Sequence, residues 1–126
     1  MSAEVEIQKA VFTRLNNALS VPVYDNVPDN AVAPYVVIGD DTLIEFDSDL
    51  GVGFEATITV HTWSTYRGRL EVKQIMGLIY NALHRAEINV QGYNLLGCDS
   101  EFSETFLESD GVTRHGVQRF RIFIRE

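Results

Sequence analysis

The spacing of apolar residues predicts two amphipathic helices. In residues 3–19 the apolar positions fall on one side of a helix that begins after an N-cap at Ser2. These positions are Ile7, Val11, Leu15 and Ala18. A second helix is predicted over 67–85, where the apolar residues follow the i, i+3, i+4, i+7 pattern. They are Val72, Ile75, Met76, Ile79, Ala82 and Leu83.

The second predicted helix has signals at both ends and one interruption. Ser64 or Thr65 is predicted to cap its start, and His84 and Arg85 suit the negative end of the helix dipole. Gly77 lies near the middle and costs about 1 kcal/mol relative to alanine. Such a glycine predicts that another element packs closely against the helix at this point.

Alternating and β-branched residues predict strands before and after the second helix. Within 54–63, apolar and polar residues alternate, which gives a strand one face for the core and one for solvent. Gly39 and Asp40 interrupt an earlier strand and predict a β-bulge. The predicted strands are 35–46, 54–63, 93–107 and 112–125, with a short strand at 23–24.

The order of these elements predicts an α+β fold with a mainly antiparallel four-stranded sheet and two helices packed on one face. The length of 126 residues fits a single domain over 1–126. We expect the first two strands to form a hairpin whose tip, residues 46–52, is an extended loop. Asp110 and Gly111 are a favourable turn pair between the last two strands.

The composition argues against several classes of protein. The formal net charge is −8, from 10 Lys and Arg against 18 Asp and Glu, so a broad nucleic-acid-binding surface is not expected. The single cysteine, Cys98, excludes an intramolecular disulfide and suits a small buried position in the core. There is no run of about 18 apolar residues, so no membrane span is expected. The first residues do not resemble a signal peptide.

Residues that could carry catalysis or bind a metal are scattered along the chain. None of His61, His84 and His115 has a second histidine or cysteine three or four positions away, as a zinc site would need. The acidic stretch 47–55 lacks the ligand order of a calcium loop. The sequence therefore predicts no catalytic residue, no cofactor and no metal site, and hence a protein that is not an enzyme. Catalytic groups that converge only in the fold would escape this search.

Charges of each sign are segregated along the chain. Between Arg14 and Arg67 there is no Lys or Arg, whereas acidic residues are frequent. The simpler interpretation is a set of solvated faces. The alternative is a dipolar subunit that binds a rotated copy of itself head to tail, a contact that closes into rings. The candidate interface residues are Asp40, Asp41, Leu43, Glu45, Phe46, Asp47 and Asp49 on the first hairpin, and Arg67, Arg69, Arg119, Arg121 and Arg125 on the basic segments.

Three segments carry a family resemblance. The sequence TVHTWSTYRGRLEVKQIMGLIYNAL at 59–83 joins a strand ending in V-H-x-W-S to an amphipathic helix. It is accompanied by PYVVIG at 34–39 and GVQRFRI at 116–122. With the chain length and the element order, these segments resemble the tail-completion proteins of long-tailed bacteriophages. That family includes tail terminators and head–tail joining proteins, with relatives in prophages and gene transfer agents.

The resemblance implies a structural virion protein. Its members form a ring, commonly a hexamer, which sits on the head-proximal end of the tail tube, stops tube polymerisation and offers a surface to the head connector. The implied partners are further copies of the chain, the tail tube protein and a head-completion or connector protein. DNA only passes through the lumen, and no membrane is involved. Assembly in the host bacterial cytoplasm is implied, with no cofactor and no active-site residue.

Two other kinds of function stay open on the sequence. A small monomeric α+β domain could bind a ligand or catalyse a reaction in a pocket between sheet and helices, and the ligand would then stabilise it. A cytoplasmic adaptor could bind another protein through a free sheet edge.

Overall fold

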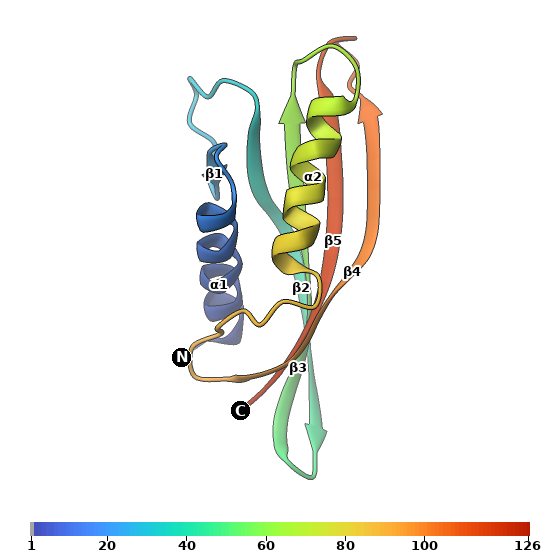
Figure 1. The fold of residues 1–126 in the computed structure, drawn as a ribbon. Coiled ribbons are helices and arrows are strands. Elements are labelled where there is room, and N and C mark those ends of the chain that lie inside the picture. The colour runs from blue at the N-terminus through green and yellow to red at the C-terminus, as the bar shows by residue number, and fades with distance from the viewer. Residues whose placement is uncertain (1) are drawn as a thin grey trace.

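Residues 2–126, the part of the chain that the computed structural model describes, form two helices and five strands (Figure 1). The elements are α1 (Ala3–Ala18), β1 (Val23–Tyr24), β2 (Tyr35–Ser48), β3 (Gly51–Ser64), α2 (Leu70–Leu83), β4 (Asn94–Leu107) and β5 (Arg114–Arg125). The strands lie in one sheet in the order β1-β2-β3-β5-β4. β1 runs parallel to β2, and all other neighbours are antiparallel. The predicted α+β class is confirmed.

The sheet has five strands where four were expected. The additional strand is β1, which pairs Val23 with Val36 and Tyr24 with Val37 at the edge of β2. The sequence indicated a short strand at this position, but two residues form too short a pattern to assign a partner in the sheet.

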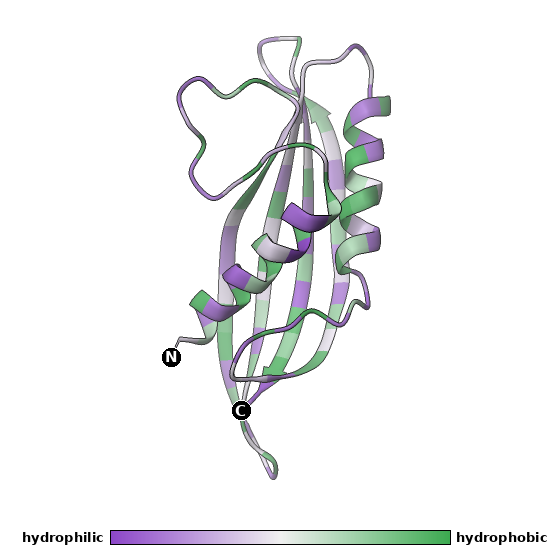
Figure 2. Cartoon of the chain, turned by 60° about the vertical axis from the view of Figure 1, so that its left-hand side comes forward, coloured by the Kyte–Doolittle hydropathy of each residue, from purple (hydrophilic) through white to green (hydrophobic). Residues whose placement is uncertain are grey.

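Both helices pack on the same face of the sheet (Figures 1 and 2). As the alternation predicts, Ala56, Ile58 and Val60 of β3 are buried beneath them. Burial of a large aliphatic or aromatic side chain contributes roughly 1.5–3 kcal/mol, so this layer is the main source of stability. The largest fully buried side chains are Phe120, Leu15, Ile58, Ile79, Leu83, Ile122 and Ile124. Within residues 2–126 no helix covers the opposite face, which we call the open face.

The loop expected at residues 46–52 is instead a paired hairpin. The β2–β3 ladder continues to the pair Ser48↔Gly51, so only Asp49 and Leu50 form the turn. Gly51 has φ +115, a conformation that residues with a side chain rarely adopt. The Ser48 hydroxyl donates to the Gly51 carbonyl at 3.0 Å and accepts from the Leu50 N–H at 3.2 Å. The end of the hairpin, residues 47–52, therefore projects beyond β5 as an ordered segment, which we call the arm (Figure 1).

The two helices begin differently. Ser2 caps α1 as predicted, because its hydroxyl accepts from the Val5 N–H at 3.4 Å. For α2 the predicted cap is wrong: the N-cap residue is Arg69, whose side chain makes no capping hydrogen bond. Ser64 is the buried last residue of β3, and its hydroxyl donates to Glu71 at 2.6 Å. Neither helix is long and apolar enough to cross a membrane.

Candidate functional site

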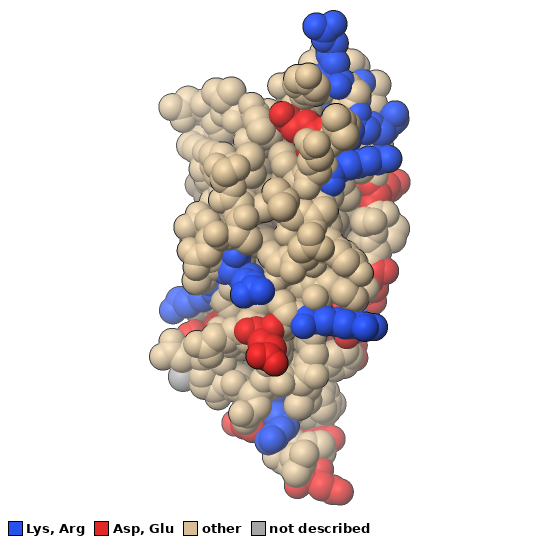
Figure 3. Space-filling model, in the orientation of Figure 1, with Lys and Arg blue, Asp and Glu red and all other residues tan. Residues whose placement is uncertain are grey.

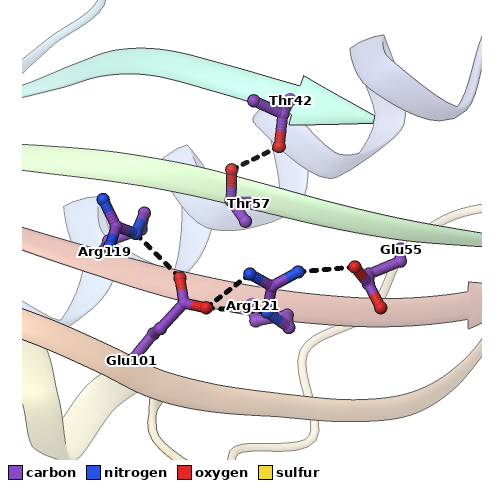
Figure 4. A network of polar contacts seen from close by, with 6 residues as sticks. All are labelled: Thr42, Glu55, Thr57, Glu101, Arg119 and Arg121. Carbon is purple, nitrogen blue, oxygen red and sulfur yellow. Dashed lines mark hydrogen bonds and ion pairs between the residues drawn. The ribbon is translucent and has the colours of Figure 1, made fainter. Parts of the chain in front are cut away.

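An ion-pair network occupies the middle of the open face (Figure 4). The Arg119 Nε atom donates to Glu101 at 2.7 Å, and the Arg121 Nε atom donates to the same carboxylate at 2.9 Å. Arg121 also reaches Glu55 of β3 through its Nη1 atom, at 2.5 Å. The guanidinium groups of Arg121 and Arg119 hold the pKa of Glu101 below its usual value. Two of the predicted interface arginines thus have carboxylate partners within their own subunit.

The third predicted interface arginine of β5, Arg125, lies at the C-terminal end of the strand. It is opposite Gly53 in the ladder, and its Nη1 atom donates to the Glu126 carbonyl at 3.3 Å. Arg125 is half-buried near the base of the projecting hairpin, and its Nε atom is buried with no hydrogen-bond partner within residues 2–126.

The acidic residues of the first hairpin divide into two groups. Asp40 lies in the predicted β-bulge between Ile38 and Asp41, and Asp41 faces the helix-covered side opposite Ile58. Asp47 and Asp49 lie on the projecting arm, Glu45 lies just before it opposite Phe54, and all three are exposed. All five carboxylates are exposed, but only Asp47 and Asp49 extend beyond β5.

Two predicted apolar contact residues have partners inside the subunit. Leu43 packs against the core, and the Phe46 ring lies over Gly53 on the open face. Two neighbouring side chains are more exposed: Ile44, which lies opposite Glu55 in the sheet, is 58% exposed, and Leu50, in the turn, is 70% exposed. Of the apolar residues near the hairpin tip, Ile44 and Leu50 are thus the most exposed, and Leu50 alone of the two lies on the arm.

The basic residues Arg67 and Arg69 lie at the opposite end of the molecule. Both are exposed in the connection that leads into α2, and Lys73 follows on the first turn. Figure 3 shows basic side chains over the start of α2 at one end and acidic side chains at the hairpin tip at the other. The basic start of α2 and the acidic hairpin tip thus lie at opposite ends of the subunit, whereas Arg125 lies at the end that carries the acidic tip.

A cluster that the sequence did not indicate lies on the open face near the basic end. The Nδ1 atom of His61 is 2.7 Å from the Nε2 atom of His115, whose own Nδ1 atom is 2.7 Å from Glu108. The Trp63 ring stacks on His115 with centroids 3.8 Å apart. Burial and the neighbouring His115 lower the pKa of His61, against a smaller opposing effect of Asp40. These residues are far apart in sequence and meet because β5 lies between β3 and β4.

The single cysteine of the chain is chemically unreactive in the fold. Cys98 is buried in the core as predicted, and burial raises the pKa of its thiol to about 12. At that pKa the thiolate is scarce at neutral pH, so Cys98 is a poor nucleophile. Within residues 2–126 no group of three or more His, Cys, Asp or Glu side chains could hold a metal ion.

Comparison with known proteins places the chain in a family. Residues 9–125 match the family model described as tail completion protein gp17. The tail completion protein gp17 of Bacillus phage SPP1 is 29% identical over 91 residues, which cover 72% of this chain and 67% of the relative.

Two solved structures share the fold. A chain of the virion of a native gene transfer agent particle aligns with a TM-score of 0.83 at 20% identity over 95% of both chains. The bacteriophage SPP1 gp17 protein aligns with a TM-score of 0.61 at 24% identity, over 95% of this chain and 89% of the other. Since the family model spans nearly all of the sequence, this chain belongs to the tail completion protein gp17 family, a family of structural phage tail proteins.

Proposed function

We propose that this protein forms a ring of identical subunits, a hexamer by resemblance, at the head-proximal end of a phage tail tube. The ring stops tube polymerisation and presents a surface to a head-completion or connector protein. The observation that carries the proposal is the family match over residues 9–125. The role is structural, with no reaction to catalyse, and the particle assembles in the host bacterial cytoplasm.

The charge distribution supports assembly from identical subunits. The acidic arm and the basic start of α2 lie at opposite ends of one subunit. Contact between unlike ends is heterologous, and such contacts generate rings when the rotation closes. Charge complementarity of this kind mainly sets register and specificity.

The open face suits a lumen through which DNA slides. DNA adheres to proteins through clustered cations that replace its counterions. Arg119 and Arg121 on this face are paired with Glu101 and Glu55. A lumen lined by this face would therefore offer DNA few free positive charges.

The proposal is tested by light scattering coupled to size exclusion at low and high salt, with and without purified tail tubes of the same phage. We expect rings with a central hole in negative-stain images, on the tube ends or in solution. Tubes that stay uncapped and continue to grow in the presence of the protein would contradict the proposal.

A further inference from the structure

No close contact within the subunit explains why residue 77 is a glycine. It lies in the middle of α2 and is exposed, and a Cβ atom built on it meets nothing within 4 Å in residues 2–126 beyond its chain neighbours and its helix's own backbone. The prediction that another element of the chain packs against Gly77 is therefore wrong. Glycine weakens a helix more than any residue except proline. A close approach by another molecule would account for a glycine at this position.

Gly77 lies on the wall of a groove between α2 and β4. The groove has a volume of about 390 Å³, with Lys73 and Tyr80 beside Gly77 on one wall and Ser103 and Thr105 on the other. Glu104 also lines it, on the side of β4. The walls combine polar and apolar surface, so the groove suits a partner segment that brings both backbone polar groups and an apolar side chain.

The groove also holds an unsatisfied acceptor. Gln118 lines it and is 3% exposed, and its Nε2 atom donates to the Met76 carbonyl at 3.0 Å. Its Oε1 atom is buried and has no hydrogen-bond partner within residues 2–126. A buried acceptor without a partner is costly, and native structures rarely keep one. A donor from a segment lying in the groove would satisfy it.

The hairpin arm of a second copy complements this groove. Leu70 is 65% exposed and Tyr80 is 43% exposed, and their spacing from Gly77 places both on its side of α2. In the turn of the arm, Leu50 is 70% exposed. The acidic residues Asp47 and Asp49 of the arm match the basic residues Arg67, Arg69 and Lys73 that lead into the groove.

We propose that the tip of the β2–β3 hairpin of one copy lies in the α2–β4 groove of the next, with its backbone against Gly77. The tip supplies the donor for the Gln118 Oε1 atom, and Leu50 packs beside Leu70 or Tyr80. The contact joins different surfaces of two identical subunits, so it repeats around a ring. This inference rests on the proposed ring and specifies which surfaces form it.

Cross-linking in assembled rings tests the contact. The double variant Asp49→Cys, Lys73→Cys is assembled on tail tubes and treated with a short bis-maleimide. Cys98 need not be replaced, because its thiol is buried. The control pair is Asp49→Cys with Asn16→Cys, which places the second thiol at an exposed position of α1. We expect covalent oligomers up to the size of the ring for the first pair only.

The outcomes separate the inference from the function on which it rests. Rings in electron micrographs without cross-links between residues 49 and 73 would overturn the tip-in-groove contact and leave the ring intact. Equal cross-linking of both pairs would overturn it as well. The absence of rings on tubes assembled with the wild-type chain would contradict the proposed function itself.

Substitution of Gly77 gives an independent test. Gly77→Gln fills the groove and supplies a better helix former, so we expect a monomer whose Tm is unchanged or a few degrees higher and which assembles at least tenfold less. The control is Leu78→Gln, which introduces the same residue at the next, exposed position of α2, outside the groove lining. Normal rings from Gly77→Gln would contradict the inference.

Discussion

The Nδ1 atom of His61 lies 2.7 Å from the Nε2 atom of His115, and only one of the two nitrogens can carry the hydrogen of that bond. On the other side of the His115 ring, the Nδ1 atom lies 2.7 Å from the carboxylate of Glu108. In this row of hydrogen-bonded groups, Glu108, His115 and His61, one hydrogen lies between the two rings, and either ring can donate it. When both rings are fully protonated, two N–H groups face each other and two positive charges repel.

The first prediction is a loss of stability at mildly acidic pH that depends on His61. Burial and His115 lower the pKa of this histidine in the folded protein below its ordinary value of 6.5. The unfolded chain therefore takes up a proton at a pH where the folded chain does not. Stability must then fall as the pH drops through the interval between the ordinary pKa and the lowered one.

Urea denaturation of wild type and His61→Asn between about pH 7.5 and about pH 5 measures this effect. Carboxylates contribute to the pH dependence of both proteins, so the informative quantity is the difference between their slopes. We expect a shallower decline for His61→Asn than for wild type. Parallel curves would show that His61 does not titrate as described.

A second prediction concerns Gly39, in the bulge of β2. A Cβ atom at this position would lie 2.7 Å from two atoms of the His61 ring. That ring cannot move away freely because it is bound to His115. We expect Gly39→Ala to destabilise the protein by about 1–3 kcal/mol, as overpacking does.

The double variant Gly39→Ala, His61→Ala isolates this contact. With the ring removed, the added methyl group has room, so the cost of Gly39→Ala should shrink in the His61→Ala background. Denaturant midpoints of the four proteins give the coupling free energy. An equal cost in both backgrounds would mean that Gly39 is required for its backbone conformation instead.

The ion-pair network around Arg121 and the histidine cluster around His115 could not be predicted from the sequence. The helices and strands follow from hydrophobic periodicity, which is local, and the structure confirms nearly all of them. The partners of Arg121 and His115 depend on β5 lying between β3 and β4, and no local pattern specifies that order. The arm was expected to be a loop because its acidic and glycine residues disfavour strands, yet cross-strand pairing with β3 overrides this preference.

The third prediction is that Arg121 acts mainly within its subunit. Because it bonds to both Glu101 and Glu55, Arg121→Glu would place three carboxylates together on the open face. We expect a lower Tm for this variant even as a monomer. The double variant Arg119→Glu, Arg121→Glu should also have a lower Tm than wild type.

Charge exchange distinguishes this role from one at an interface. Adding Glu101→Arg to Arg121→Glu restores one pair of opposite charges within the subunit, so part of the Tm should return. Thermal unfolding by circular dichroism is sufficient to measure it. If Arg121→Glu unfolds at the wild-type temperature and only assembly is lost, the arginine serves the interface instead.

The last prediction separates assembly from folding at the arm. Asp47 and Asp49 are exposed beyond the body of the sheet, so Asp47→Lys with Asp49→Lys should leave the Tm of the monomer within a degree or two. Assembly should fail, because a basic tip would meet the basic start of α2 in the next copy.

Replacing Arg67 and Arg69 by Glu in the same chain makes the two ends complementary again, with the signs exchanged. We therefore expect rings from the fourfold variant, measured by light scattering and negative stain, and none from either double variant. Because the fourfold variant differs from each double variant only in charge, its recovery would identify charge pairing between these two ends as the cause. Rings from all three variants would show that the ends do not meet.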